Sequence, residues 1–277
     1  MAIGIYLMLG ICSQVKDVTA IIKLLSTALF LILLLPAALA SSDALFQTST
    51  INALMMGDFH GTMSFKELKS HGDFGLGTFN RLDGEMVGLD GKFYQMKSDG
   101  HAYPVNDTAT TPFAEVAFFK AEDNISLNGM YNLTQMESYL DSKLPTRNIF
   151  YAIRIDGTFD YVKTRAPQAQ SEPYPTLTEA LKTQKIFQFN NTTGTVVGFW
   201  YPGYAKDINV PGYHLHFINE NRSAGGHLLD IKVSKARVAI DELTELDMAL
   251  PTDKEFYQAD LSGDQQAAVN KAESNPK

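Results

Sequence analysis

The fold of the second half of the chain is decided by YHLHF at residues 213–217, with the polar segment 219–226 and His227 behind it. Side chains two positions apart on a β-strand share a face, so an extended 213–217 segment places His214 and His216 side by side. The apolar residues that alternate with them then face the opposite way, into a core. The polar segment is a long turn that leads to a second strand. The pattern therefore predicts a β-hairpin on which three imidazoles meet.

Three neutral imidazoles leave coordination positions open, which is typical of a catalytic zinc site. Gly225 and Gly226 permit a close backbone approach or a bulge that aims His227 inward. Burying unpaired imidazoles on an apolar strand costs several kcal/mol, roughly, so we favour a metal site over ordinary core or surface histidines. The spacing does not choose zinc over copper or manganese. The remaining histidines flank glycines and are predicted to be solvated loop residues: His60, His71 and His101.

Strand-like alternation dominates the rest of the chain, with few helices. Ser64 and Glu67 form a capping box for a short helix, and Asp90-Gly91 favours a tight hairpin turn between strands at 84–87 and 92–96. Further strands are predicted at 113–119, 148–155, 186–189, 195–201, 213–218, 227–233 and 235–240. Further helices are predicted at 136–142, 176–185, 253–259 and 264–272. This order indicates a strand-rich α+β fold rather than a wound parallel sheet.

The proline-rich stretch 167–175 marks a domain boundary. We therefore expect an N-terminal α/β part at 41–166 and a C-terminal, β-rich, zinc-binding part at 167–277. The chain has 277 residues and a formal charge of -8, with no basic stripe. Because nucleic-acid binding requires clustered Lys and Arg, no nucleic-acid partner is expected.

Residues 1–40 have the parts of a secretory signal peptide. Lys16 and Lys23 precede the apolar run 24–35, and an Ala-Leu-Ala sequence ends at Ala40. The run is shorter than the roughly 20 residues that span a bilayer, so we expect a secreted or periplasmic protein, cleaved near Ala40. A second apolar stretch at 3–12 leaves open a retained anchor, which would be the only membrane association, or a start at Met8. The single cysteine, Cys12, lies in this leader, so disulfide and thiolate chemistry are not expected in the mature chain.

Several stretches resemble the acetolactate decarboxylases. They are HGDFGLGTFN at 71–80 with its continuation through 82–86 and 90–95, YVKTR at 161–165, and the histidine-containing run 212–229. The resemblance spans essentially the whole chain after the leader. It implies an N-terminal mixed β-sheet layer and a C-terminal barrel-like β-sheet, with the active site in the cleft between them. It also implies a homodimer.

The same resemblance implies roles for individual residues. His214, His216 and His227 match the family's zinc ligands. The matching catalytic residues are Arg165, Glu85, Glu273 and Thr78. Without the resemblance, Glu85 would be interpreted as a solvated strand carboxylate and Arg165 as part of a surface salt bridge.

The activity implied is decarboxylation of 2-acetolactate to acetoin and carbon dioxide, with Zn²⁺ as a Lewis-acid electron sink for an enediolate. Arg165 would orient the substrate carboxylate, while Glu85 and Glu273 would move the proton. Two other functions remain open from the residues alone. One is a cupin-type dioxygenase or isomerase, suggested by Glu220 four residues after His216. The other is an exported zinc-binding protein without catalysis.

Overall fold

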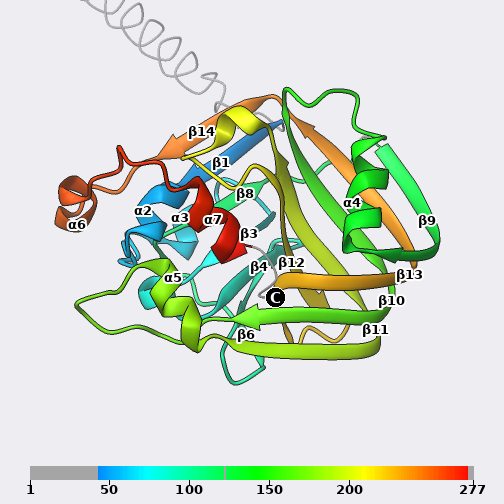
Figure 1. Cartoon of the computed structure of the whole chain (residues 1–277), viewed down its shortest axis with the longest axis horizontal. Helices are drawn as coiled ribbons and strands as arrows, with labels where there is room; N and C mark the ends of the chain where they lie inside the picture. The colour runs from blue at the N-terminus through cyan, green and yellow to red at the C-terminus, as the bar shows by residue number, and fades with distance from the viewer. Residues whose placement is uncertain (1–42, 122, 274–277) are drawn as a thin grey trace, which may run out of the picture. The chain divides into compact units, whose positions relative to one another are not determined.

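Two β-sheets lie side by side in the structure, a computed structural model that describes residues 43–121 and 123–273 (Figure 1). The predicted leader, residues 1–40, lies outside the described residues. The described residues belong to one compact unit, Ser41–Lys277. Within the described residues, no helix has the length and apolar character needed to cross a membrane.

The first sheet, sheet A, contains seven strands and is mixed. Its order is β14 (Glu245–Ala249), β1 (Ala44–Thr48), β8 (Ala114–Ala117), β3 (Phe74–Thr78), β4 (Glu85–Leu89), β5 (Lys92–Met96) and β6 (Ala102–Pro104). Only β1 and β14 pair in parallel. Asp90 and Gly91 connect β4 and β5 with φ angles of 54° and 72°, which confirms the predicted hairpin turn. A separate small ribbon pairs β2 (Met63–Ser64) with β7 (Thr110–Thr111).

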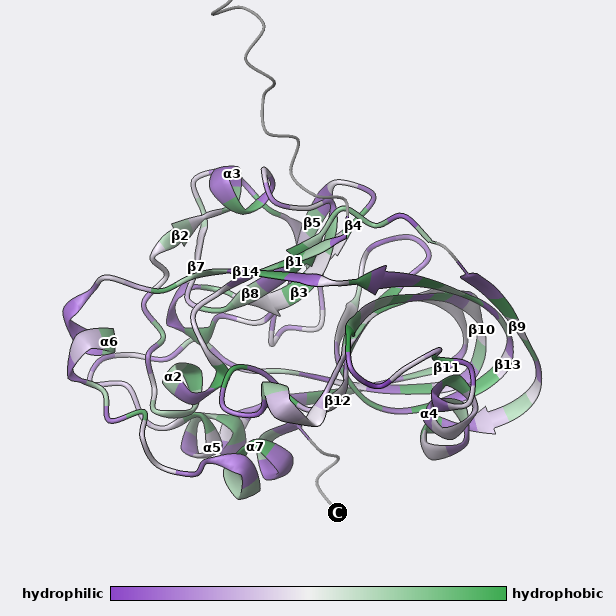
Figure 2. Cartoon of the chain, turned by 90° about the horizontal axis from the view of Figure 1, so that it is seen from above, coloured by the Kyte–Doolittle hydropathy of each residue, from purple (hydrophilic) through white to green (hydrophobic). Residues whose placement is uncertain are grey.

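The second sheet, sheet C, is antiparallel and closes into a ring. Its order is β10 (Phe150–Ala166), β11 (Lys185–Tyr201), β12 (Gly212–Asn219), β13 (Gly225–Leu243) and β9 (Asp123–Asn132). The ring closes because β10 pairs with both β11 and β13. Figure 2 shows this ring beside the strands of sheet A. The predicted strand-rich α+β fold, with a mixed sheet and a barrel-like sheet, is confirmed.

Two strands of the barrel are longer than the sequence pattern predicted. The separate strands expected at 186–189 and 195–201 are one strand, β11, and those at 227–233 and 235–240 are one strand, β13. The polar residues 190–193 suggested a break, but they continue the ladder with β10 and are largely exposed. The predicted domain boundary after Ala166 falls between β10 and β11, which are neighbours in one sheet, and it stays a prediction.

The helices of the described residues are all short. They are α2 (Ile51–Met55), α3 (Phe65–Leu68), α4 (Leu133–Asp141), α5 (Leu177–Ala180), α6 (Lys254–Gln258) and α7 (Gln266–Glu273), with 3-10 turns at Asn80–Leu82, Leu181–Thr183 and Gly203–Ala205. The Glu67 amide donates to the Ser64 hydroxyl at 3.3 Å, which confirms the predicted N-cap of α3. The sequence pattern missed α2 because all five of its residues are buried, which leaves no polar face to mark a helical period.

Apolar packing joins sheet A to the outer wall of the barrel. One buried cluster combines Phe74 and Val87 of sheet A with Phe199 and Ile218 of sheet C. Burying side chains of this size contributes about 1.5 to 3 kcal/mol each. A second cluster fills the barrel and includes Leu215 and Phe217, as the alternation around the histidines predicted. A third lies under α2, α5 and α7, which lie close together in Figure 1. The first cluster holds the barrel wall that includes β12 against sheet A.

Candidate metal centre and active site

Three histidine side chains meet on the wall of the barrel that faces sheet A. His214 and His216 lie on β12, and His227 lies opposite His216 on β13. The three ring centroids are 5.3 Å apart in every pair. The side chains are buried, with 6%, 1% and 3% of the three residues exposed. The hairpin therefore brings the three imidazoles together as predicted from the i and i+2 spacing.

The two glycines before His227 allow the close approach of three strands. A Cβ at Gly226 would lie 2.3 Å from the carbonyl oxygen of Arg165, and the φ of Gly226 is +143°. A Cβ at Gly225 would lie 2.1 Å from the carbonyl oxygen of Phe217. A register shift between Lys163 and Thr164 then leaves an extra residue on β13. The close approach predicted for the glycine pair is therefore present, whereas the bulge lies at Leu229, after His227.

Glu85 enters the site from sheet A. It is 7% exposed, and its Oε2 lies 3.7 Å from Nε2 of His216. Burial raises the pKa of Glu85 to about 7, against the opposing effect of the Arg165 guanidinium. Interpreting Glu85 as a solvated carboxylate is therefore wrong. Thr78 pairs with Glu85 across β3 and β4 and donates to the carbonyl oxygen of Gly84 at 2.7 Å.

Arg165 lies on β10, opposite His227. The residue is 4% exposed, so interpreting it as part of a surface salt bridge is wrong. Its Nε lies 3.7 Å from Oε1 of Glu85, and its Nη2 lies 3.3 Å from Oε1 of Glu273. Its Nη1 also donates to the carbonyl oxygen of Ala272. The guanidinium thus lies between a carboxylate of sheet A and one at the end of α7.

Glu273 reaches the histidines from the last residue of α7. Its Oε2 lies 3.4 Å from Nε2 of His227 and 3.6 Å from Nε2 of His214. The structure therefore brings together all seven residues that the sequence singled out. They line one cavity, whose remaining wall is mainly apolar and consists of Ile51, Leu54, Gly77, Leu82, Phe113, Pro167, Leu177 and Leu181.

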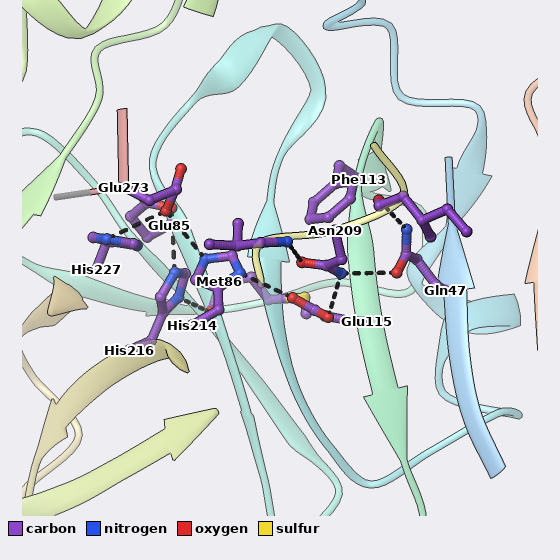
Figure 3. Close-up of polar contacts among 12 residues, drawn as sticks. Gln47, Glu85, Met86, Phe113, Glu115, Asn209, His214, His216, His227 and Glu273 are labelled. Atoms are coloured by element: carbon purple, nitrogen blue, oxygen red, sulfur yellow. Dashed lines mark hydrogen bonds and ion pairs between the residues drawn. The ribbon is translucent and has the colours of Figure 1, made fainter. Parts of the chain in front are cut away.

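A second group of polar residues lies behind the histidines, and the sequence did not single it out. Glu115 of β8 is fully buried, and its Oε1 lies 3.0 Å from Nδ1 of His214 (Figure 3). Asn209 donates to Oε2 of Glu115 at 2.7 Å and to Oε1 of Gln47 at 2.8 Å. On the next ligand, Nδ1 of His216 lies 2.7 Å from the carbonyl oxygen of Met86. The one sequence feature that could have pointed to this group is the single acid, Glu115, within the apolar run 113–119.

The other three histidines lie elsewhere. The ring of His71 stacks on Phe46 with centroids 3.7 Å apart, so this residue is partly packed rather than simply solvated. Nε2 of His60 lies 3.5 Å from Glu172. The His101 side chain is 70% exposed, as predicted for a loop histidine.

The donor set fits a divalent metal ion. The three histidines present ring nitrogens that all lie within 4.8 Å of one another. Nε2 of His216 is buried and has no hydrogen-bond partner. The contacts from the Nε2 atoms to Glu85 and Glu273 are 3.4 to 3.7 Å, longer than ordinary hydrogen bonds. Imidazoles with adjacent carboxylates are a ligand set that zinc and other transition metals accept.

Known proteins match both the sequence and the structure. A family model for alpha-acetolactate decarboxylase matches residues 45–263. The alpha-acetolactate decarboxylase of Methanosarcina mazei is 49% identical over 233 residues, covering 84% of this chain and 81% of that protein. Its counterpart in Bacillus licheniformis is 45% identical over 235 residues, covering 84% and 93%. The crystal structure from Bacillus subtilis strain 168 has a TM-score of 0.82 at 41% identity, covering 84% of this chain and 100% of that one.

The fold, the site and these matches define a carboxy-lyase, an enzyme that removes carbon dioxide from its substrate. The chain belongs to the alpha-acetolactate decarboxylase family. The residues matched by the family model include the three histidines, Glu85 and Arg165, whereas Glu273 lies beyond them.

Proposed function

We propose that this enzyme converts 2-acetolactate into acetoin and carbon dioxide, with Zn²⁺ held by His214, His216 and His227. The observation that carries the proposal is a cavity in which the three buried histidines lie with Arg165, Glu85 and Glu273. Family membership supports the substrate. Among the metals that three imidazoles with open positions accept, zinc is the one that the resemblance to the acetolactate decarboxylases supports.

The reaction breaks one carbon–carbon bond and makes one carbon–hydrogen bond. The electron pair left behind by departing carbon dioxide must be delocalised onto the neighbouring ketone oxygen, and one proton must then reach carbon. A zinc ion held by the histidines supplies Lewis acidity, which lowers the energy of that developing negative charge by several kcal/mol, roughly. The protein side chains must orient the carboxylate, exclude water and deliver the proton.

Arg165 is suited to orient the substrate carboxylate. A guanidinium presents parallel N–H donors that match the two oxygens of a carboxylate. Its burial between Glu85 and Glu273 fixes its direction. A guanidinium stays charged throughout the physiological pH range and is a poor proton donor, so we assign Arg165 binding and charge stabilisation.

Glu85 and Glu273 are suited to move the proton. The Glu85 carboxyl, whose pKa is raised to about 7, holds or releases a proton near neutral pH, which is the condition for efficient general acid–base catalysis. The two carboxyls contact different nitrogens of the same guanidinium, Glu85 at Nε and Glu273 at Nη2. Because the proton arrives from a fixed side, we expect one acetoin enantiomer in excess.

The test is formation of acetoin from racemic 2-acetolactate by the purified full-length protein, with and without a chelator. We expect acetoin that disappears with the chelator and returns when Zn²⁺ is added back. Chiral chromatography of the product tests the stereochemistry. Tight zinc binding without acetoin would instead support the non-catalytic zinc-binding alternative.

The cupin-type alternative does not fit. His227 comes from the strand next to β12 in both sequence and space, whereas a cupin takes its last histidine from a distant strand. Family membership also assigns the chain to another group of enzymes.

We also propose that the protein is exported and cleaved near Ala40, and that it forms a homodimer. N-terminal sequencing of the secreted protein tests cleavage, and light scattering after size exclusion tests the dimer. An intact leader on the mature protein would favour an anchor, while a monomer at micromolar concentration would contradict the dimer.

A further inference from the structure

The three histidines differ in what holds the far side of each ring. Nδ1 of His214 lies 3.0 Å from the carboxylate of Glu115. Nδ1 of His216 lies 2.7 Å from the Met86 carbonyl oxygen. Nδ1 of His227 is buried and has neither a hydrogen bond nor an ion pair among the described residues, whereas Nδ1 of His214 and Oε1 of Glu115 are at ion-pair distance without the alignment of a hydrogen bond. Only one ligand therefore has an acid behind it.

Both partners belong to sheet A, although all three histidines belong to the barrel. Glu115 lies on β8 and Met86 on β4. Figure 3 shows these contacts running from the histidines across to sheet A. Sheet A thus contacts His214 and His216 through Nδ1, while their Nε2 atoms face the carboxylates of the cavity.

The Glu115 carboxylate is held in place from behind. Its second oxygen accepts a hydrogen bond from Asn209, which also donates to Gln47. Gln47 donates in turn to the carbonyl oxygens of Ser49 and Ile208, at 2.8 and 2.9 Å. Gln47 and Glu115 are fully buried, and Asn209 is 1% exposed. A buried carboxylate is costly unless it is paired and hydrogen-bonded, and here its free oxygen faces His214.

We propose that Glu115 is a positioning residue of the metal centre. Its carboxylate accepts the Nδ1–H of His214, which fixes the ring in the tautomer that presents Nε2 to the metal and increases the electron density on that nitrogen. Such partners behind a ligand typically change metal affinity about 10- to 100-fold. The inference rests on the proposed metal centre and does not depend on the identity of the substrate.

A purely structural role is the competing explanation. The Gln47–Asn209–Glu115 chain also links β1 and the segment before β12 to β8. A structural role predicts a lower melting temperature with unchanged zinc affinity. A positioning role predicts weaker zinc binding even where the protein remains folded.

The experiment compares Glu115→Gln with Asp241→Asn in the full-length protein. Asp241 is also a buried acid, 1% exposed, which accepts from the Lys120 amide at 2.8 Å. Its variant therefore controls for removal of a buried negative charge. Zinc Kd is measured by competition with a chromophoric chelator, and the melting temperature is measured on the metal-free proteins.

We expect Glu115→Gln to weaken zinc binding about 10- to 100-fold, equivalent to about 1.4 to 2.7 kcal/mol. We expect Asp241→Asn to change Kd less than about threefold, a smaller shift than any expected from loss of a ligand's partner. The downfield imidazole N–H resonance of His214, seen by NMR in the parent protein, should move upfield in Glu115→Gln only. A zinc Kd for Glu115→Gln within threefold of the parent would overturn the proposal.

Glu115→Asp serves if Glu115→Gln does not fold. It keeps the charge but withdraws the carboxylate by one methylene, so weaker zinc binding is again expected and an unchanged Kd again contradicts the proposal. The zinc-binding result can be interpreted independently of the proposed decarboxylase activity. A parent protein that makes no acetoin would refute the substrate while leaving the zinc affinities measurable.

Discussion

Sheet C and sheet A contribute opposite kinds of side chain to one site. The barrel supplies nitrogen groups, namely three imidazoles and the Arg165 guanidinium, from the adjacent strands β10, β12 and β13. Sheet A supplies oxygen groups, Glu85 on β4 and Glu115 on β8. The nitrogen groups meet through pairing of neighbouring strands within one sheet, whereas the oxygen groups meet them only because the two sheets pack together.

This difference shows which residues cost free energy when the site is buried. Burial raises the pKa of both Glu85 and Glu115, which means that their ionised forms are disfavoured by the surroundings. The opposing contributions come from Arg165 for Glu85 and from His214 for Glu115. Apolar packing between the sheets therefore stabilises an arrangement that the burial of the two acids would oppose.

The largest effect on zinc content and activity is expected when one of the barrel's histidine ligands is removed. His216→Ala removes the most buried of the three imidazoles, which leaves two ligands and an incomplete site. We expect zinc content to fall to near zero and acetoin formation to fall to the level of chelator-treated enzyme. Metal analysis and the acetoin assay measure both. Full zinc occupancy in this variant would show that the histidine hairpin is not the metal centre.

Arg165→Ala removes the barrel's cationic group but none of its metal ligands. We expect turnover to fall about 100- to 1000-fold, the size of effect seen when a preorganised charge-stabilising donor is lost. Zinc content should remain close to that of the parent. Steady-state kinetics and metal analysis on the same sample make the comparison, with Arg165→Lys as the variant that keeps the charge. Equal loss of zinc and turnover would refute the assigned role.

The glycine before His227 tests how strictly the strand geometry is required. A Cβ at Gly226 would collide with the Arg165 carbonyl, whereas Gly91, with a φ of +72°, has nothing within 4 Å of that position. We expect Gly226→Ala to lower the free energy of unfolding by about 3 kcal/mol or more. Gly91→Ala should cost about 1 kcal/mol, from backbone conformation alone. Denaturant titration compares them, and equal losses would argue against the close approach at Gly226.

The smallest effect concerns an acid on the barrel side that lies outside the metal centre. Burial, and then Asp141, raises the pKa of Glu137 on α4 to about 7. The ionised form is disfavoured in the folded state, so stability is lost as the pH rises from the unfolded value of about 4.3 through about 7. We expect Glu137→Gln to raise the free energy of unfolding at pH 8 by about 1 kcal/mol, after allowance for partial solvent screening.

The same variant should have only a small effect at pH 4, where the carboxyl is protonated in the folded state and mostly protonated in the unfolded state. Unfolding is followed by denaturant titration at both pH values. The exposed Glu245→Gln controls for the loss of a surface charge. A gain at pH 4 equal to that at pH 8 would contradict the assigned cause.

The histidine hairpin could be predicted from the sequence because its geometry is local. The spacing of His214 and His216, the polar turn and the glycine pair all act within sixteen residues of chain, from 212 to 227. The turn at Asp90-Gly91 and the cap at Ser64 were predictable for the same reason. Family resemblance, and not spacing, pointed to Glu85, Arg165 and Glu273.

Other features required the folded molecule. The alternation in β11 and β13 predicted strands but missed their continuity, because exposed polar residues inside a long strand resemble a loop. The all-buried helix α2 had no polar face to reveal it. In the sequence Glu115 is a single acid within the apolar run 113–119, and its place behind His214 depends on how sheet A packs against the barrel.

The sequence by itself therefore determined a strand-rich fold and a three-histidine centre, since both follow from the period of side chains along a strand. Tertiary structure alone decided that Glu115, Asn209 and Gln47 lie behind that centre. Residues 47, 115 and 209 are far apart in the chain. Packing of the two sheets brings them together, and such contacts leave no periodic trace in the sequence.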